Sequence, residues 1–227
     1  MPRSSRRPPP FTPFAAAFAV ASGLLLFAGC QAAYFGALEK MGIPKREVLV
    51  DRVASARSSQ EAAKEQFASA LEKLLAITKV EPGEIKERYD LLNAELKRNE
   101  ARAADVRHRL NGVRDVAEAL FDEWNDELKQ YSSAELRNRS AAQLEKTQRN
   151  YRDLMIVMER AAARMEPVLN AFRDQVLFLK HNLNAQAVRS LDTTSQTLQE
   201  DIGKLIADME NSIREADEFI QTLKPAG

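Results

Sequence analysis

Hydrophobic side chains recur every three or four residues along most of this chain. Alternating steps of three and four are the heptad signature of helices that pack side by side with a left-handed twist. No stretch shows the two-residue alternation of a strand, so a sheet protein is excluded. The pattern falls into four segments, with apolar stripes that run from Leu49 to Ile77, from Ile85 to Trp124, from Thr147 to Leu183 and from Leu191 to Leu223.

Short breaks separate the four segments, and each has a local cause. The sequence Glu81-Pro82-Gly83 ends the first helix, because proline cannot continue a helix and glycine accepts left-handed dihedral angles. Ser132 and Glu135 match a capping box, which satisfies backbone amides at the start of the third helix. A turn with a weaker signature is predicted at 184–192. Pro167 lies in phase within the third segment and therefore predicts a kink.

These elements predict an all-α protein, an elongated antiparallel helical bundle of four long, coiled-coil-like helices. Short loops make consecutive helices antiparallel. Without a turn at 184–192, the last two helices would merge and the fold would become a three-helix rod.

Two polar residues interrupt the apolar stripes, Gln60 in the first helix and Asn99 in the second. Folding one helix onto the other about residues 79–83 places them in adjacent layers, beside Ala63 and Ala103. One interpretation is that they fix the register, as a buried asparagine does in coiled coils. The other is that they line a small polar ligand cavity.

The first 29 residues have the pattern of an export signal peptide. Arg3, Arg6 and Arg7 precede an apolar run, 14–28, that ends in small residues. Cys30 follows directly, as in a bacterial lipobox, where the cysteine is acylated and becomes the new N-terminus.

The residues around Cys30 suggest a destination for the lipoprotein. Phe27 stands where leucine is usual in a lipobox, and Gln31 replaces the aspartate associated with inner-membrane retention. We therefore expect an outer-membrane lipoprotein facing the periplasm, with Cys30 carrying the lipid (palmitate among its acyl chains). The alternative is an uncleaved anchor in the inner membrane, since 11–38 carries no charge and is long enough to span a bilayer.

This interpretation divides the chain into three parts. They are a signal peptide (1–29), a lipid-anchored tether or interfacial segment (30–43) and the helical bundle (44–227). Within the tether, four apolar residues either lie against the membrane surface or close the end of the bundle: Tyr34, Phe35, Leu38 and Met41.

Charge adds a prediction about helix pairing. The chain has 33 basic and 33 acidic residues, a balance that gives no reason to expect nucleic acid as a partner. The four predicted helices, 44–78, 84–131, 134–183 and 191–224, carry net charges of +1, −3, +3 and −5 in turn. Neighbouring helices therefore have opposite signs, which favours this pairing, and the acidic fourth helix is the face most available to a partner.

Three short sequences give the chain a family resemblance. Residues 177–185 (LFLKHNLNA), 208–213 (DMENSI) and 34–42 (YFGALEKMG) resemble the proteobacterial domain of unknown function family 2959. The resemblance extends over essentially the whole chain after the signal peptide. It implies an envelope lipoprotein or secreted coiled-coil protein, and it supplies no catalytic residues.

Candidate chemistry is sparse. A di-iron bundle needs two Glu-x-x-His motifs and two further inward glutamates, whereas the chain offers only Asp105 three residues before His108, beside the apolar stripe. His181 has no such carboxylate, and no glycine-rich phosphate loop is present. We therefore expect no enzyme activity, no cofactor and no metal.

Charged residues cluster on both sides of the turn at 131–133. Acidic residues surround Trp124 where the second helix ends, and arginines follow where the third begins. Three interpretations remain: ion pairing across the turn, a partner-docking tip, or a calcium site. The residues of the possible docking tip are Trp124, Asp126, Glu127, Arg137 and Arg139.

Two functions fit these features. The first is a non-enzymatic scaffold, spacer or adaptor that binds envelope proteins through its helix faces or its tip. The alternative is a lipid-handling bundle that shields acyl chains in its apolar seam. Self-association is also expected, because Leu71, Leu75 and Phe219 flank the stripes.

The lipid anchor gives a direct test. Replacing Cys30 with serine removes the thiol that would be acylated, so incorporation of a fatty-acid analogue into the protein should be abolished. Metabolic labelling of cells that produce the wild-type or the Cys30→Ser chain measures this. Unchanged labelling of the variant would show that Cys30 is not the attachment site.

Overall fold

The computed structural model describes residues 36, 41–77, 85–182 and 185–224 of the chain. The chain divides into two compact units, Met1–Pro44 and Lys45–Gly227. The predicted signal peptide (1–29), Cys30, Tyr34, Phe35 and Leu38 lie outside the described residues, as does the predicted break at 81–83. Met41 is 74% exposed, and none of the described helices is long and apolar enough to cross a membrane.

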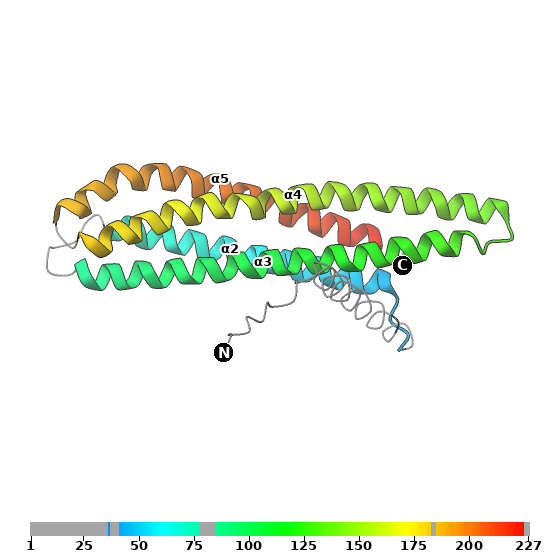
Figure 1. Ribbon diagram of the computed structural model, residues 1–227. Helices are drawn as coiled ribbons and strands as arrows, with labels where there is room; N and C mark the ends of the chain where they lie inside the picture. The colour runs from blue at the N-terminus through cyan, green and yellow to red at the C-terminus, as the bar shows by residue number, and fades with distance from the viewer. Residues whose placement is uncertain (1–35, 37–40, 78–84, 183–184, 225–227) are drawn as a thin grey trace, which may run out of the picture. The chain divides into compact units, whose positions relative to one another are not determined.

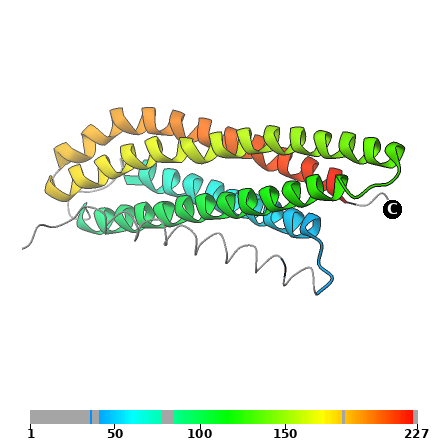
Figure 2. The same ribbon diagram turned by 45° about the vertical axis from the view of Figure 1, so that its right-hand side comes forward.

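Four helices form the second unit, which confirms the all-α prediction. They are α2 (Lys45–Ile77), α3 (Ile85–Leu128), α4 (Ala134–His181) and α5 (Ala185–Leu223). Within this unit α2 and α4 each pack against both α3 and α5, so the helices form a ring of four antiparallel neighbours (Figures 1 and 2). The structure is thus a four-helix bundle, and the three-helix rod is excluded.

The predicted apolar stripes form the core of the bundle. Residues at the alternating three- and four-residue positions are almost entirely buried, and a continuous apolar seam of this kind is what holds such helices together. The largest fully buried side chains come from all four helices: Leu49, Phe67, Leu74, Leu92, Leu154, Met158, Met165, Leu169, Leu179 and Leu198.

Helix ends differ in detail from the prediction. Ser133, and not Ser132, is the N-cap of α4, since its backbone is extended (φ −81°, ψ 118°) and its Oγ accepts a hydrogen bond from the Leu136 amide. The predicted capping box is therefore wrong. The turn after α4 is shorter than 184–192, because α4 ends at His181 and α5 begins at Ala185. Helix α4 continues through Pro167 as predicted.

Ion pairs cross all four helix interfaces, as the alternating charges predict. At three interfaces the signs also agree with the net charges of the helices. The pairs are Lys45–Glu123 and Lys73–Glu95 between α2 and α3, Arg57–Asp217 and Lys64–Glu210 between α2 and α5, and Arg164–Asp208 between α4 and α5. Between α3 and α4 two of three pairs have the opposite polarity, with the arginine on α3.

Candidate functional site

Helices α3 and α4 extend beyond the other two helices at one end of the bundle. Lys45, the first residue of α2, forms an ion pair with Glu123 (Nζ to Oε2, 3.3 Å). In space, the start of α2 therefore lies beside a residue of α3 that is five positions before the end of that helix. Near the end of α5, Thr222 lines a surface groove together with Asn150 of α4. The remaining parts of α3 and α4 project as a two-helix hairpin, here defined as residues 124–143 (Figures 1 and 2).

The hairpin has no buried residues of its own. Every residue from 124 to 143 is at least partly exposed, and Tyr131 and Leu136 are 39% and 52% exposed. Trp124 is held at its base, where the indole N–H donates a 2.8 Å hydrogen bond to Ser140 Oγ. The guanidinium of Arg46 lies 5.3 Å from the centre of the same ring, within cation–π range. The hairpin is therefore anchored at its base and available to solvent at its tip.

The predicted ion pairing across the turn of the hairpin is wrong. Asp126 pairs with Lys129 within its own stretch of chain, and Arg139 pairs with Glu135 four residues earlier in α4. Each partner lies three or four residues away on the same arm, a spacing at which side chains meet. Among the described residues neither Glu127 nor Arg137 forms an ion pair, so both charges are presented to solvent.

Gln60 connects three helices inside the bundle. Its Nε2 donates to the backbone carbonyl of Met158 on α4 (3.2 Å), and its Oε1 accepts from Ser212 Oγ on α5 (2.6 Å). Both Gln60 and Ser212 are fully buried. Sliding α2 against α4 would break the first hydrogen bond, and sliding it against α5 would break the second, so Gln60 has the position expected of a register-fixing residue.

Asn99 has a different environment from Gln60. It is fully buried, and its amide donates only to the carbonyl of Glu95 in its own helix (3.1 Å). Among the described residues, its Oδ1 has no hydrogen-bond partner. The adjacent space, which Phe67 and Phe172 help to line, has no room for a water molecule. This space does not accommodate the predicted polar ligand, and Asn99 forms no hydrogen bond to another helix.

Glu95 is a buried carboxylate whose burial the apolar pattern of the sequence does not indicate. Its side chain is fully buried, accepts hydrogen bonds from Gln66 (2.6 Å) and Lys73 (2.5 Å) of α2, and also pairs with Arg98. Burial alone would raise its pKa, but the hydrogen bonds from Lys73 and Gln66 outweigh burial and lower the pKa below the usual value for glutamate. Glu95 is therefore ionised and helps to join α2 to α3.

The residues considered for metal chemistry do not converge. Asp105 accepts a 2.7 Å hydrogen bond from Ser59 of α2 and pairs with Arg109, and these contacts lower its pKa. His108 and His181 are exposed. In the part of the chain that the structure describes, no three His, Cys, Asp or Glu side chains are grouped so that they could hold a metal ion.

A family model matches residues 34–223, and its description is "Protein of unknown function (DUF2959)". The chain belongs to the DUF2959 family. This agrees with the resemblance seen in the three short sequences and covers the whole described bundle. A comparison with curated proteins finds no match. Membership in DUF2959 assigns no activity, so function must be argued from the bundle itself.

The lowered pKa of Glu95 predicts how the stability of the bundle depends on pH. An ionised Glu95 stabilises the folded state above the pKa of an unfolded glutamate, about 4.3, and this contribution is lost as the pH falls towards the lower pKa of the folded state. Glu95→Gln should therefore lower the free energy of unfolding by about 1.5–3 kcal/mol at pH 7, and the difference should shrink in acid. Thermal unfolding followed by circular dichroism at several pH values measures it.

Glu87→Gln is the matched control, because Glu87 is exposed on the same helix. An equal loss of stability in both variants, or a difference for Glu95→Gln that stays constant down to pH 3, would contradict the role of the buried carboxylate.

Asn99 and Gln60 give a paired prediction with opposite signs. Asn99→Leu removes a buried oxygen without a partner, so the melting temperature should rise by roughly 2–4 °C for each kcal/mol gained. Gln60→Leu leaves the Ser212 hydroxyl without its acceptor and should lower the melting temperature. Differential scanning calorimetry of both variants tests this. Strong destabilisation by Asn99→Leu would reveal an internal hydrogen-bond network around Asn99.

Proposed function

We propose that this DUF2959 protein is a non-enzymatic lipoprotein, anchored at Cys30 in the outer membrane and facing the periplasm, where it acts as a helical-bundle scaffold or adaptor. The single observation that carries the proposal is the projecting hairpin. A bundle stabilised by its core does not need 20 further residues of which none is fully buried. An exposed two-helix extension with unpaired charges is suited to contact another protein.

The covalent chain limits where the hairpin can lie relative to the anchor. Cys30 precedes Lys45 by 15 residues, and a fully extended segment of that length spans about 50 Å. Because Lys45 pairs with Glu123 at the base of the hairpin, a lipid on Cys30 keeps this base within about 50 Å of the membrane surface. We therefore propose that the docking tip contacts a partner close to the membrane surface.

The chemistry of the tip favours a protein partner. Exposed Tyr131 and Leu136 provide apolar contact area, while Glu127 and Arg137 provide charges of both signs close by. Protein interfaces combine an apolar, often aromatic, centre with a polar rim in this way. The net charge of the tip is close to zero, so attraction to an anionic surface is not needed for the proposed role.

Photo-cross-linking in intact cells tests the proposed docking tip. A photoreactive amino acid at position 127 or 137 should capture an envelope protein, because both side chains are exposed on the hairpin. The same amino acid at position 86 is the matched control, since the Lys86 side chain is 79% exposed near the opposite end of the bundle. The adducts are identified by mass spectrometry.

The expected result is a defined adduct, heavier than the chain itself, from the hairpin positions and not from position 86. Adducts of equal yield at both ends of the bundle, or none from the hairpin, would rule out the hairpin as the docking element. Loss of the adduct in the Cys30→Ser chain would in addition show that docking depends on the anchor.

A further inference from the structure

The outer face of α3 and α4 carries three ion pairs at intervals of seven residues. Arg114 binds Glu159 through Nε and Nη2 at 3.1 and 2.9 Å, and Arg107 Nη1 lies 3.3 Å from Glu166 Oε2. The third pair joins Glu100 to Arg173 (Oε1 to Nε, 3.2 Å) and has the opposite polarity. We call these six residues the ladder: Glu100, Arg107 and Arg114 on α3, and Arg173, Glu166 and Glu159 on α4.

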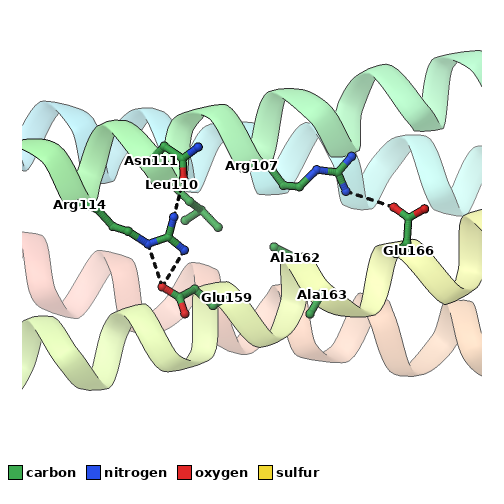
Figure 3. A pocket seen from close by; sticks show the side chains of 8 residues that line it. All are labelled: Arg107, Leu110, Asn111, Arg114, Glu159, Ala162, Ala163 and Glu166. Atoms are coloured by element: carbon green, nitrogen blue, oxygen red, sulfur yellow. Dashed lines mark hydrogen bonds and ion pairs between the residues drawn. The ribbon is translucent and has the colours of Figure 1, made fainter. Parts of the chain in front are cut away.

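A groove of about 400 Å³ lies between two pairs of the ladder. Arg107 with Glu166 closes one end and Arg114 with Glu159 the other, as Figure 3 shows. Small side chains, including Ala162 and Ala163, leave this space open between the helices.

This face is not covered by the other helices of the bundle. Helices α2 and α5 pack against α3 and α4 from behind, in the direction away from the viewer in Figure 3. Beside the ladder, Ile156, Ala163 and Leu177 follow one another on α4 at multiples of seven residues, and all are exposed. Ile156 and Leu177 are 55% and 48% exposed, more than most of the large apolar side chains in the described residues.

The charges of the ladder match those of a second copy in one particular orientation. At each level of the ladder α3 and α4 carry opposite charges. A twofold axis parallel to the helices would place α3 of one copy opposite α4 of the other, at the same level. Each arginine would then face a glutamate of the partner copy, and each pair would become a square of alternating charges.

We propose that the α3–α4 face is a homodimer interface in which two copies pack in parallel, ladder against ladder. The inference deepens the proposed scaffold function and rests on it, since it names a second copy as one protein partner. In a parallel dimer the N-terminal ends of both α2 helices lie at the same end of the assembly. This arrangement is compatible with two lipid anchors in one membrane.

Of the three residues expected to support self-association, Phe219 is buried, whereas Leu71 and Leu75 are half-buried. Phe219 is only 3% exposed and belongs to the core, while Leu71 is partly buried and lines the internal space beside Asn99. Phe219 therefore does not contribute to a surface, and the α3–α4 face offers more exposed apolar side chains for association.

An antiparallel dimer on the same groove would have unfavourable charges. In such a dimer the twofold axis lies in the interface, perpendicular to the helices, and passes through the groove. It would bring Arg107 of one copy against Arg114 of the other, and Glu159 against Glu166. Like charges facing each other across an interface oppose association. The two orientations therefore respond in opposite ways when the charges are exchanged.

The test is a charge swap in the full-length chain, R107E/R114E/E159R/E166R. The swapped chain keeps both ion pairs within each copy, and the natural Glu100–Arg173 pair shows that this polarity fits between α3 and α4. Wild-type and swapped chains with two different epitope tags are co-expressed, extracted in mild detergent and captured through one tag. The second tag then reports which copies associate.

We expect the copies to sort by kind. The yield of captured chain should be at least about tenfold higher for two wild-type copies, or for two swapped copies, than for a wild-type copy with a swapped one. Mixed pairs are disfavoured because they bring like charges together. Equal capture of all combinations, preferential mixed capture, loss of pairing between swapped chains, or no association at all would each overturn the parallel dimer.

Two controls keep the result interpretable. The thermal unfolding of the swapped chain must match that of the wild type, and if it does not, the single-pair swap R114E/E159R is used with the same expected sorting. Failure of sorting is also distinct from failure of the scaffold proposal, which is judged by acylation at Cys30 and by cross-links from the hairpin.

Discussion

The seven-residue repeat of buried apolar side chains is the constraint on which the rest of this structure depends. Each helix contributes one narrow stripe, and four stripes close on one another without a central cavity that would hold water near Asn99. Such a seam fixes the direction of each helix, but a repeat of similar layers tolerates sliding by one heptad. Gln60 breaks this equivalence, because only one register brings it to both Met158 and Ser212.

Outside the seam, the four helices differ in how much of their surface is already used. Helices α2 and α5 are shorter, and their flanking side chains are bound to neighbours through pairs such as Arg57–Asp217. Helices α3 and α4 are longer and leave two surfaces open, the hairpin at one end and the ladder along one side. The proposed contacts, one with another envelope protein and one with a second copy, use separate surfaces of the same two helices.

Much of the fold could be predicted from sequence because a heptad pattern over 33 to 48 residues has few alternatives. Cap positions were less certain, since Ser132 and Ser133 are chemically identical and only the backbone angles distinguish them. Glu95 and Ser212 were missed because each lies next to a stripe residue and resembles a solvated flanking position. Their burial depends on Lys73 and Gln60, which come from another helix, and such partners emerge only when the register between helices is known.

The family resemblance supported the fold and left function open, and the surface explains why sequence alone goes no further. Spacing shows that Glu100, Arg107 and Arg114 share one face of α3. It does not show that Glu159 and Glu166 stand level with them, because this depends on the length and path of the turn at 129–133. Likewise, the sequence suggests that the acidic and basic clusters beside Trp124 pair with each other. In the structure Glu123 instead forms an ion pair with Lys45, and Asp126 forms one with Lys129.

The contact between Lys45 and Glu123 has a mechanical consequence. Tension between the chain that precedes α2 and a partner held on the hairpin would enter and leave the bundle at the same end. The load would pass from the first turn of α2 through the Lys45–Glu123 pair and the Arg46–Trp124 contact into α3. The far end of the bundle lies away from this path and would carry less of the force, so the load would be concentrated at the base of the hairpin.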